Sequence, residues 1–63
     1  MLMYKVGDEI VDKRNDREIE IKRIADGLYF CGVQDEARHI YYCTWFTEDE
    51  LDYISGKRKK NKR

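Results

Sequence analysis

The sequence is poor in the residues that build metal sites and disulfide-stapled folds. Its 63 residues include one histidine, two cysteines and no proline. A structural zinc site needs a set of four closely spaced ligands, and Cys31 and Cys43 do not form a C-x-x-C pair. Small secreted domains usually carry more cysteines, so the composition favours two reduced cysteines over one disulfide. We expect no metal and no cofactor.

Long apolar runs are also missing. No stretch approaches the roughly 18 apolar residues of a membrane-spanning helix. The opening Met1-Leu2-Met3 is followed at once by Tyr4 and Lys5, so we expect no apolar signal-peptide region. A cytoplasmic protein is therefore expected, with no membrane partner.

The charge is zero overall, with 13 Lys+Arg and 13 Asp+Glu, but it is unevenly distributed. Residues 57–63 hold six of the cations and no acid, which leaves seven cations and 13 acids, a net of −6, in residues 1–56. So short a chain has room for one domain. We predict one domain over residues 1–56 and a disordered basic tail over residues 57–63.

Short strands separated by turn signals predict an all-β fold. Arg17–Ile24 alternates apolar and charged residues, which is typical of a strand with one wet face, and a bulge or strand end is expected near Arg23. Asp26-Gly27 then predicts a type I′ hairpin turn. The other predicted strands are 9–12, 28–33, where Gly32 is expected to mark a bend or bulge, and 39–46.

A short helix is predicted at the end of the domain. Thr47 and Glu50 have the spacing of a capping box, and Gly56 is suited to end the helix after Ile54. We expect the helix over residues 48–54. The predicted core comprises Val6, Ile10, Ile19, Ile21, Leu28, Phe30, Ile40, Tyr42, Phe46, Leu51 and Ile54.

Two motifs support a resemblance to a known group of proteins. The opening Lys5–Val11, with its Val-Gly-Asp, and the closing Trp45–Leu51, of the form Phe-x-Glu-Asp-Glu-Leu, resemble small SH3-like barrel proteins of phages and prophages. The resemblance implies an SH3-like barrel or curled antiparallel meander of four to five strands. If the chain is phage-encoded, it would act in the host cytoplasm. The resemblance says little about function, because such barrels bind proteins, peptides, DNA and RNA.

Catalytic residues are not expected. If Val33 pairs with Arg38 in the hairpin, then His39 and Cys43 share a face but lie about 13 Å apart, at ~3.3 Å per residue. That separation is too large for a nucleophile and its base. We predict that the protein is not an enzyme.

Acidic side chains dominate the charge of the domain and predict its binding surface. A negative face steers onto a basic surface of a partner. We expect a small non-catalytic module, a monomer or homodimer, that blocks or modulates a host protein, such as a nucleic-acid-handling or defence enzyme. The expected acidic face consists of Asp8, Glu9, Asp12, Glu18, Glu20, Asp35, Glu36, Glu48, Asp49 and Asp52, with Tyr29, Tyr41 and Trp45 as surface aromatics.

Nucleic-acid binding is the alternative. The tail could neutralise phosphates, and the strand aromatics could stack on bases. An acidic domain opposes this function because it repels phosphate. The cations that would carry it are Lys57, Arg58, Lys59, Lys60, Lys62 and Arg63.

Overall fold

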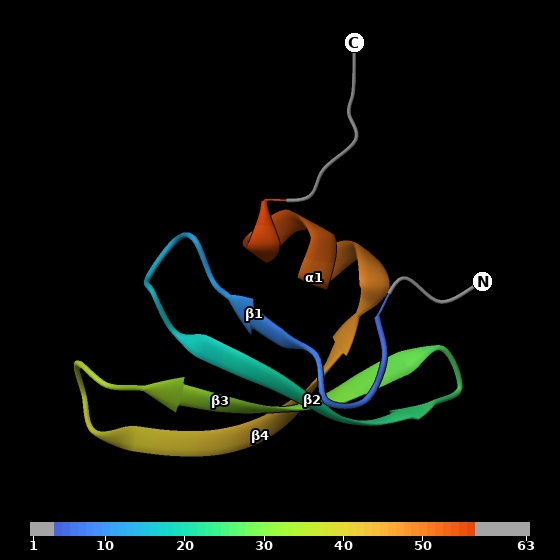
Figure 1. The fold of residues 1–63 in the computed structure, drawn as a ribbon, viewed down its shortest axis with the longest axis horizontal. Helices are drawn as coiled ribbons and strands as arrows, with labels where there is room; N and C mark the ends of the chain where they lie inside the picture. The colour runs from blue at the N-terminus through green and yellow to red at the C-terminus, as the bar shows by residue number, and fades with distance from the viewer. Residues whose placement is uncertain (1–3, 57–63) are drawn as a thin grey trace, which may run out of the picture.

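A computed structural model describes residues 4–56 of the chain. Four strands form one antiparallel meander in the order β1-β2-β3-β4, and a helix follows the last strand (Figure 1). The elements are β1 (Glu9–Val11), β2 (Glu18–Ala25), β3 (Leu28–Asp35), β4 (Ile40–Thr47) and α1 (Glu48–Ser55). The predicted all-β meander with a C-terminal helix is confirmed, and the predicted tail lies outside the described residues.

The helix packs on one face of the sheet, close to β1 and to the end of β4 (Figure 1). The amide of Lys13, just after β1, donates to the carbonyl of Ile54 in the last turn of the helix at 2.8 Å. Leu51 and Ile54 are 0% and 3% exposed. The sheet therefore has an inner face toward the helix and an outer face away from it.

The β2–β3 hairpin follows the sequence prediction closely. Ala25 pairs with Leu28 across Asp26-Gly27, and these two turn residues have φ of 55° and 75°. Positive φ at both positions is the geometry of a type I′ turn. The register shifts between Ile21 and Arg23, which confirms the bulge expected there.

The core contains the isoleucines of β2 that were predicted to be buried. On β3, however, the buried face is the one that was predicted to point outward. Buried side chains are Tyr4, Ile10, Ile19, Ile21, Tyr29, Cys31, Val33, Leu51 and Ile54, and Ile24 and Phe46 pack against them. The prediction that Leu28 and Phe30 point inward is wrong, because Tyr29, Cys31 and Val33 take that face. Ile19 and Ile21 pair with Val33 and Cys31, and directly opposed residues share a face.

Three further residues that were predicted to lie in the core are exposed. Val6, Ile40 and Tyr42 are 58%, 42% and 38% exposed. Val6 lies in the turn before β1. Ile40 and Tyr42 are on the inner face, because they pair with Asp35 and Val33, but β4 is an edge strand with a neighbour on one side only.

Candidate functional site

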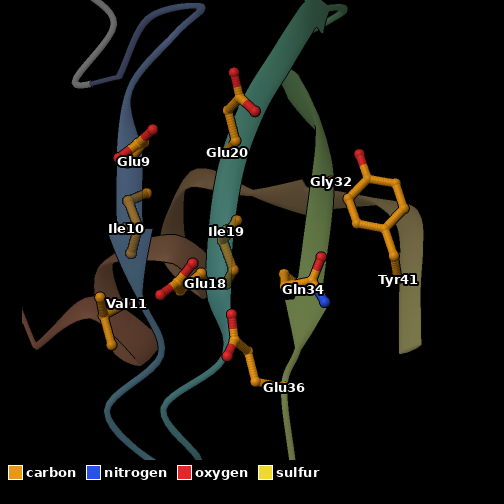
Figure 2. A pocket seen from close by; sticks show the side chains of 10 residues that line it. All are labelled: Glu9, Ile10, Val11, Glu18, Ile19, Glu20, Gly32, Gln34, Glu36 and Tyr41. Carbon is orange, nitrogen blue, oxygen red and sulfur yellow. The ribbon is translucent and has the colours of Figure 1, made fainter. Parts of the chain in front are cut away.

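The candidate site is a hollow of about 540 Å³ on the outer face of the sheet (Figure 2). Glu9 and Val11 project from β1, Glu18 and Glu20 from β2, and Tyr41 from β4. The register explains why they meet: Glu9 is opposite Glu20, and Val11 is opposite Glu18. Ile10 and Ile19 alternate with these residues along the two strands and are buried. Because successive side chains of a strand point to opposite faces, the acidic residues point outward.

Four carboxylates, those of Glu9, Glu18, Glu20 and Glu36, line this hollow, and no cationic residue does. All four residues are exposed. Like charges directly opposite each other in a sheet are destabilising, so the pairing of Glu9 with Glu20 costs stability. We define these four residues as the acidic hollow.

One cation approaches the acidic hollow from its border. The Lys22 ammonium lies 3.5 Å from a Glu20 carboxylate oxygen. The Glu20 charge, followed by a hydrogen bond to Tyr41, raises the pKa of Lys22. Lys22 stays charged at neutral pH and offsets part of the repulsion at Glu20.

Tyr41 forms the wall of the hollow toward β4, because its ring lies across Gly32 of β3 (Figure 2). A Cβ atom at position 32 would stand 2.2 Å from the Tyr41 hydroxyl oxygen. Gly32 sits in a regular part of the β3–β4 ladder. The glycine that suggested a bend therefore makes room for an aromatic side chain.

Three of the ten acids predicted for the binding face are buried instead. Asp12, Asp35 and Asp52 are 3%, 4% and 9% exposed, and each is held by a partner inside the domain. The Arg14 guanidinium binds Asp12, the Arg17 guanidinium binds Asp35, and the Tyr4 hydroxyl donates to Asp52. Sequence alone gave no sign of these pairs except for the Asp12/Arg14 spacing.

Three further predicted acids, Asp8, Glu48 and Asp49, are exposed or half-buried and serve local structure. The half-buried Asp8 accepts a hydrogen bond from the backbone amide of Lys5 in the turn before β1. Glu48 and Asp49 lie in the first turn of α1, where carboxylates interact well with the helix dipole. Only the four residues of the acidic hollow are therefore brought together.

Two of the three aromatic residues that were predicted to lie on the surface are exposed. Tyr41 and Trp45 are 54% and 43% exposed. Tyr29 is 0% exposed and packs edge-on against Tyr4 in the core, with ring centroids 5.6 Å apart. It is not a surface aromatic, because it lies on the inner face with Cys31.

A second cluster, which the sequence reasoning missed, occupies the other end of the outer face. Arg23, Phe30 and Trp45 are register neighbours across β2, β3 and β4. The Phe30 and Trp45 rings are 4.9 Å apart and tilted by 50°. The sequence could have revealed part of this row by counting outward from the Asp26-Gly27 turn. The turn pairs Ala25 with Leu28, the next pair is Ile24 with Tyr29, and the third is Arg23 with Phe30.

The structure distributes the two thiols and the histidine over different parts of the sheet. Ile40 pairs with Asp35, so the assumed pairing of Val33 with Arg38 is wrong. Cys31 is opposite Thr44, the neighbour of Cys43, so the two thiols lie on opposite faces. Burial raises the pKa of Cys31 to about 11, whereas Cys43 is exposed. His39 lies in the β3–β4 turn with φ of 57°.

Within residues 4–56, no three His, Cys, Asp or Glu side chains are arranged to hold a metal ion. The helix of residues 48–55, within the part of the chain that the structure describes, is too short and polar to cross a membrane. The predicted tail cations lie outside the part of the chain that the structure describes. Comparison with protein-family models, curated proteins and solved structures finds no match for this chain.

Proposed function

We propose that the protein is a small non-catalytic binding module whose acidic hollow takes up a basic segment of a partner protein. The observation that carries this proposal is the gathering of Glu9, Glu18, Glu20 and Glu36 around one hollow with no cation in its lining. Glu9 and Glu20 are directly opposed, and Lys22 at the border offsets only part of their repulsion. A bound cation would relieve that repulsion.

The hollow also suits the shape of an arginine or lysine side chain. Such side chains place a charged head in polar surroundings and lay an aliphatic stem on apolar surface. Val11 is 53% exposed and Tyr41 is 54% exposed, and both line the hollow beside the carboxylates. A guanidinium would form charge-assisted hydrogen bonds with the carboxylates while its stem packs on these two residues.

The kind of partner follows from this chemistry and from the resemblance to phage and prophage barrels. A surface that binds basic segments competes with nucleic acid for a basic groove, since both present negative charge. We therefore extend the proposal to a protein that blocks or modulates a host enzyme acting on nucleic acid or in defence. This extension rests on the resemblance as well as on the hollow.

An arginine-rich peptide labelled with a fluorophore tests the proposal by anisotropy. Glu18→Gln with Glu20→Gln removes two charges from the hollow and keeps the side-chain shapes. We expect affinity to fall by about tenfold or more, because charged hydrogen bonds contribute ~1.5–3 kcal/mol each. The matched control is Asp26→Asn with Asp49→Asn, which removes the same charge from exposed sites outside the hollow.

Comparison of the two double variants shows whether the peptide binds at the acidic hollow or is attracted by the overall negative charge. Equal weakening by both double variants would show non-specific attraction and contradict the proposal. If the hollow variants alone lose the peptide, a second assay follows. The wild-type protein should then displace DNA from a basic DNA-binding protein, and the hollow variants should not.

Nucleic-acid binding is the second candidate, and the row of Arg23, Phe30 and Trp45 favours it. A cation beside two aromatic rings on an open sheet is a surface on which bases stack. Trp45 is the single tryptophan of the chain, so its fluorescence reports on this row. Quenching by a single-stranded oligonucleotide, reduced by Arg23→Gln and by truncation after Gly56, would favour this function over the first.

A further inference from the structure

The outer edge of β4 is unpaired within residues 4–56. β4 pairs with β3 over eight consecutive residues without a bulge. It contains no charged residue and no proline. Edge strands are usually protected by charges, prolines, bulges or short length. The other edge, β1, has only three residues and carries Glu9, so β4 alone lacks every one of these protections.

Large apolar side chains are exposed on both faces of this strand. Tyr41 and Trp45 are 54% and 43% exposed on the outer face, and Ile40 and Tyr42 are 42% and 38% exposed on the inner face. A helix or a loop laid on one face would cover only one of these pairs. A strand added to the edge would lie beside both.

We propose that the occupant is a second copy of this chain, with β4 paired antiparallel to β4 about a two-fold axis at Cys43. The register follows from the side chains. Opposed residues share a face, and placing Cys43 opposite its own copy sets Tyr41 against Trp45 and Ile40 against Phe46 of the second copy. Moving the axis to Thr44 would instead place Ile40 opposite Glu48 and Tyr41 opposite Thr47, which loses both apolar pairs.

Charge at the two ends of the strand supports the same arrangement. Arg38, whose side chain is 69% exposed and whose Nε lies 3.8 Å from an Asp35 carboxylate oxygen, precedes β4, and Glu48, Asp49 and Glu50 follow it. Antiparallel self-pairing brings the basic end of each strand beside the acidic end of the other. The register at Cys43 brings the turn that holds Arg38 near the start of α1 in the second copy, and the symmetry repeats this approach.

The net charge of −6 on each domain does not oppose the pairing strongly. Glu9, Glu18 and Glu20 lie on β1 and β2, on the side of the sheet away from the seam. With strands about 4.8 Å apart, Glu20 of one copy lies roughly 24 Å from Glu20 of the other across the joined sheet. The Debye length at physiological salt is about 8 Å, so this repulsion is screened.

Sedimentation of the full chain under reducing conditions tests the proposal, and a charge placed on each edge provides the comparison. Cys43→Lys sets two cations directly opposite each other at the axis, at a position already exposed. Val11→Lys places the same charge on the β1 edge, where Val11 is 53% exposed. We expect a dimer for wild type and Val11→Lys. For Cys43→Lys the dissociation constant should rise by about a hundredfold or more, since opposed like charges cost several kcal/mol.

Thiol oxidation tests the register separately. Diamide removes one hydrogen from each of two neighbouring thiols and should link Cys43 to Cys43 in wild type and in Cys31→Ser. It should not link a Cys31→Ser, Cys43→Ser, Thr44→Cys variant, because position 44 faces Tyr42 in the proposed register. Efficient linkage at position 44 and not at 43 would overturn the register.

Two outcomes overturn the dimer itself. One is a monomer at every concentration up to the millimolar range, including the case in which a peptide from another protein adds to β4. The other is a dimer that survives Cys43→Lys and is lost in Val11→Lys. Circular dichroism of each variant verifies that the monomer remains folded. The dimer proposal rests on the edge of β4 and not on the carboxylates of the acidic hollow, although Tyr41 of β4 borders both.

Discussion

Tyr41 lies so close over Gly32 that a Cβ atom at position 32 would stand 2.2 Å from its hydroxyl oxygen and 2.8 Å from the Cε atom of Lys22. Both neighbours are the far ends of long side chains, so they can move where a backbone atom could not. The glycine thus sets the position of the wall of the acidic hollow. It also explains why β3, buried on both sides at this point, carries no larger residue here.

Gly32→Ala should therefore displace Tyr41 and leave the sheet intact. We expect the free energy of unfolding to fall by about 1 kcal/mol, at the low end of overpacking costs. The cost should be smaller in a Tyr41→Ala background, because the main obstacle is gone. Urea unfolding of the two single variants and the double variant measures this coupling. An equal cost of Gly32→Ala in both backgrounds would show that Tyr41 is not the side chain being displaced.

A second prediction concerns alkaline pH and Tyr4. The Tyr4 hydroxyl donates to the Asp52 carboxylate at 2.5 Å, and Tyr4 is 2% exposed. Burial, and then the Asp52 hydrogen bond, raise the pKa of Tyr4 to about 12 from the ordinary 10.0. Between these pH values the folded protein keeps a proton that the unfolded chain has released. The contribution of Tyr4 to stability is complete below pH 10 and is lost as pH rises to 12, by ~2–3 kcal/mol.

Tyr4→Phe separates this effect from general alkaline unfolding. Removing the donor leaves the buried Asp52 carboxylate with one partner fewer, so we expect a loss of about 1–3 kcal/mol at pH 7. The decline of stability between pH 10 and 12 should become shallower in the same variant. Tyr53→Phe is the control, since Tyr53 is 58% exposed. An unchanged alkaline slope in Tyr4→Phe would mean that another group causes it.

The sequence was sufficient for the elements whose signals are local. The Asp26-Gly27 turn, the bulge beside Arg23 and the capping box at Thr47 each depend on a few neighbouring residues, and all three are present. Ile19 and Ile21 were assigned to the core because their neighbours are charged. A shift of the strand by one residue would have buried Glu18 and Glu20, so the alternating pattern determines which face of this strand points inward.

The faces of β3 could not be assigned in the same way. Leu28-Tyr29-Phe30-Cys31 is apolar in both phases, so alternation does not decide which pair points inward. The exact position of the bulge decides it, because the shift at Lys22 changes which residues of β3 share a face with Ile19 and Ile21. The candidate site shared this difficulty: its acids were identified, but Asp12, Asp35 and Asp52 could be removed from the binding face only once their buried partners were known.

A third prediction concerns acid pH and Asp12. Its carboxylate accepts hydrogen bonds from the backbone amide, Nε and Nη2 of Arg14 at 2.9, 3.1 and 2.9 Å. The Arg14 side chain holds the pKa of Asp12 below its usual 3.8. Because the folded state binds this proton less readily than the unfolded chain, the contribution is present above about pH 3.8. It is lost as pH falls through the lower folded value.

Asp12→Asn should cost about 1–3 kcal/mol at pH 7, since a charged hydrogen-bond acceptor is removed from a buried position. It should also flatten the loss of stability below pH 4. Asp16→Asn is the matched control, because Asp16 is exposed in the same turn. Urea unfolding at pH 7, 4 and 3 gives both quantities. A parallel downward shift of the whole acid profile in Asp12→Asn would show that its titration does not contribute.

The last prediction concerns the junction of β4 and α1, where one residue ends the strand and caps the helix. The Glu50 amide donates to Thr47 Oγ1 at 3.1 Å, and the Thr47 amide donates to Glu50 Oε1 at 2.8 Å. Thr47→Ala should lower the free energy of unfolding by about 1 kcal/mol, and Thr47→Ser should retain most of it. Because α1 carries the fully buried Leu51, amide hydrogen exchange in the helix should accelerate in Thr47→Ala before exchange in β2 and β3 does. Equal acceleration in the helix and the sheet would show that the cap stabilises the whole domain and not the helix in particular.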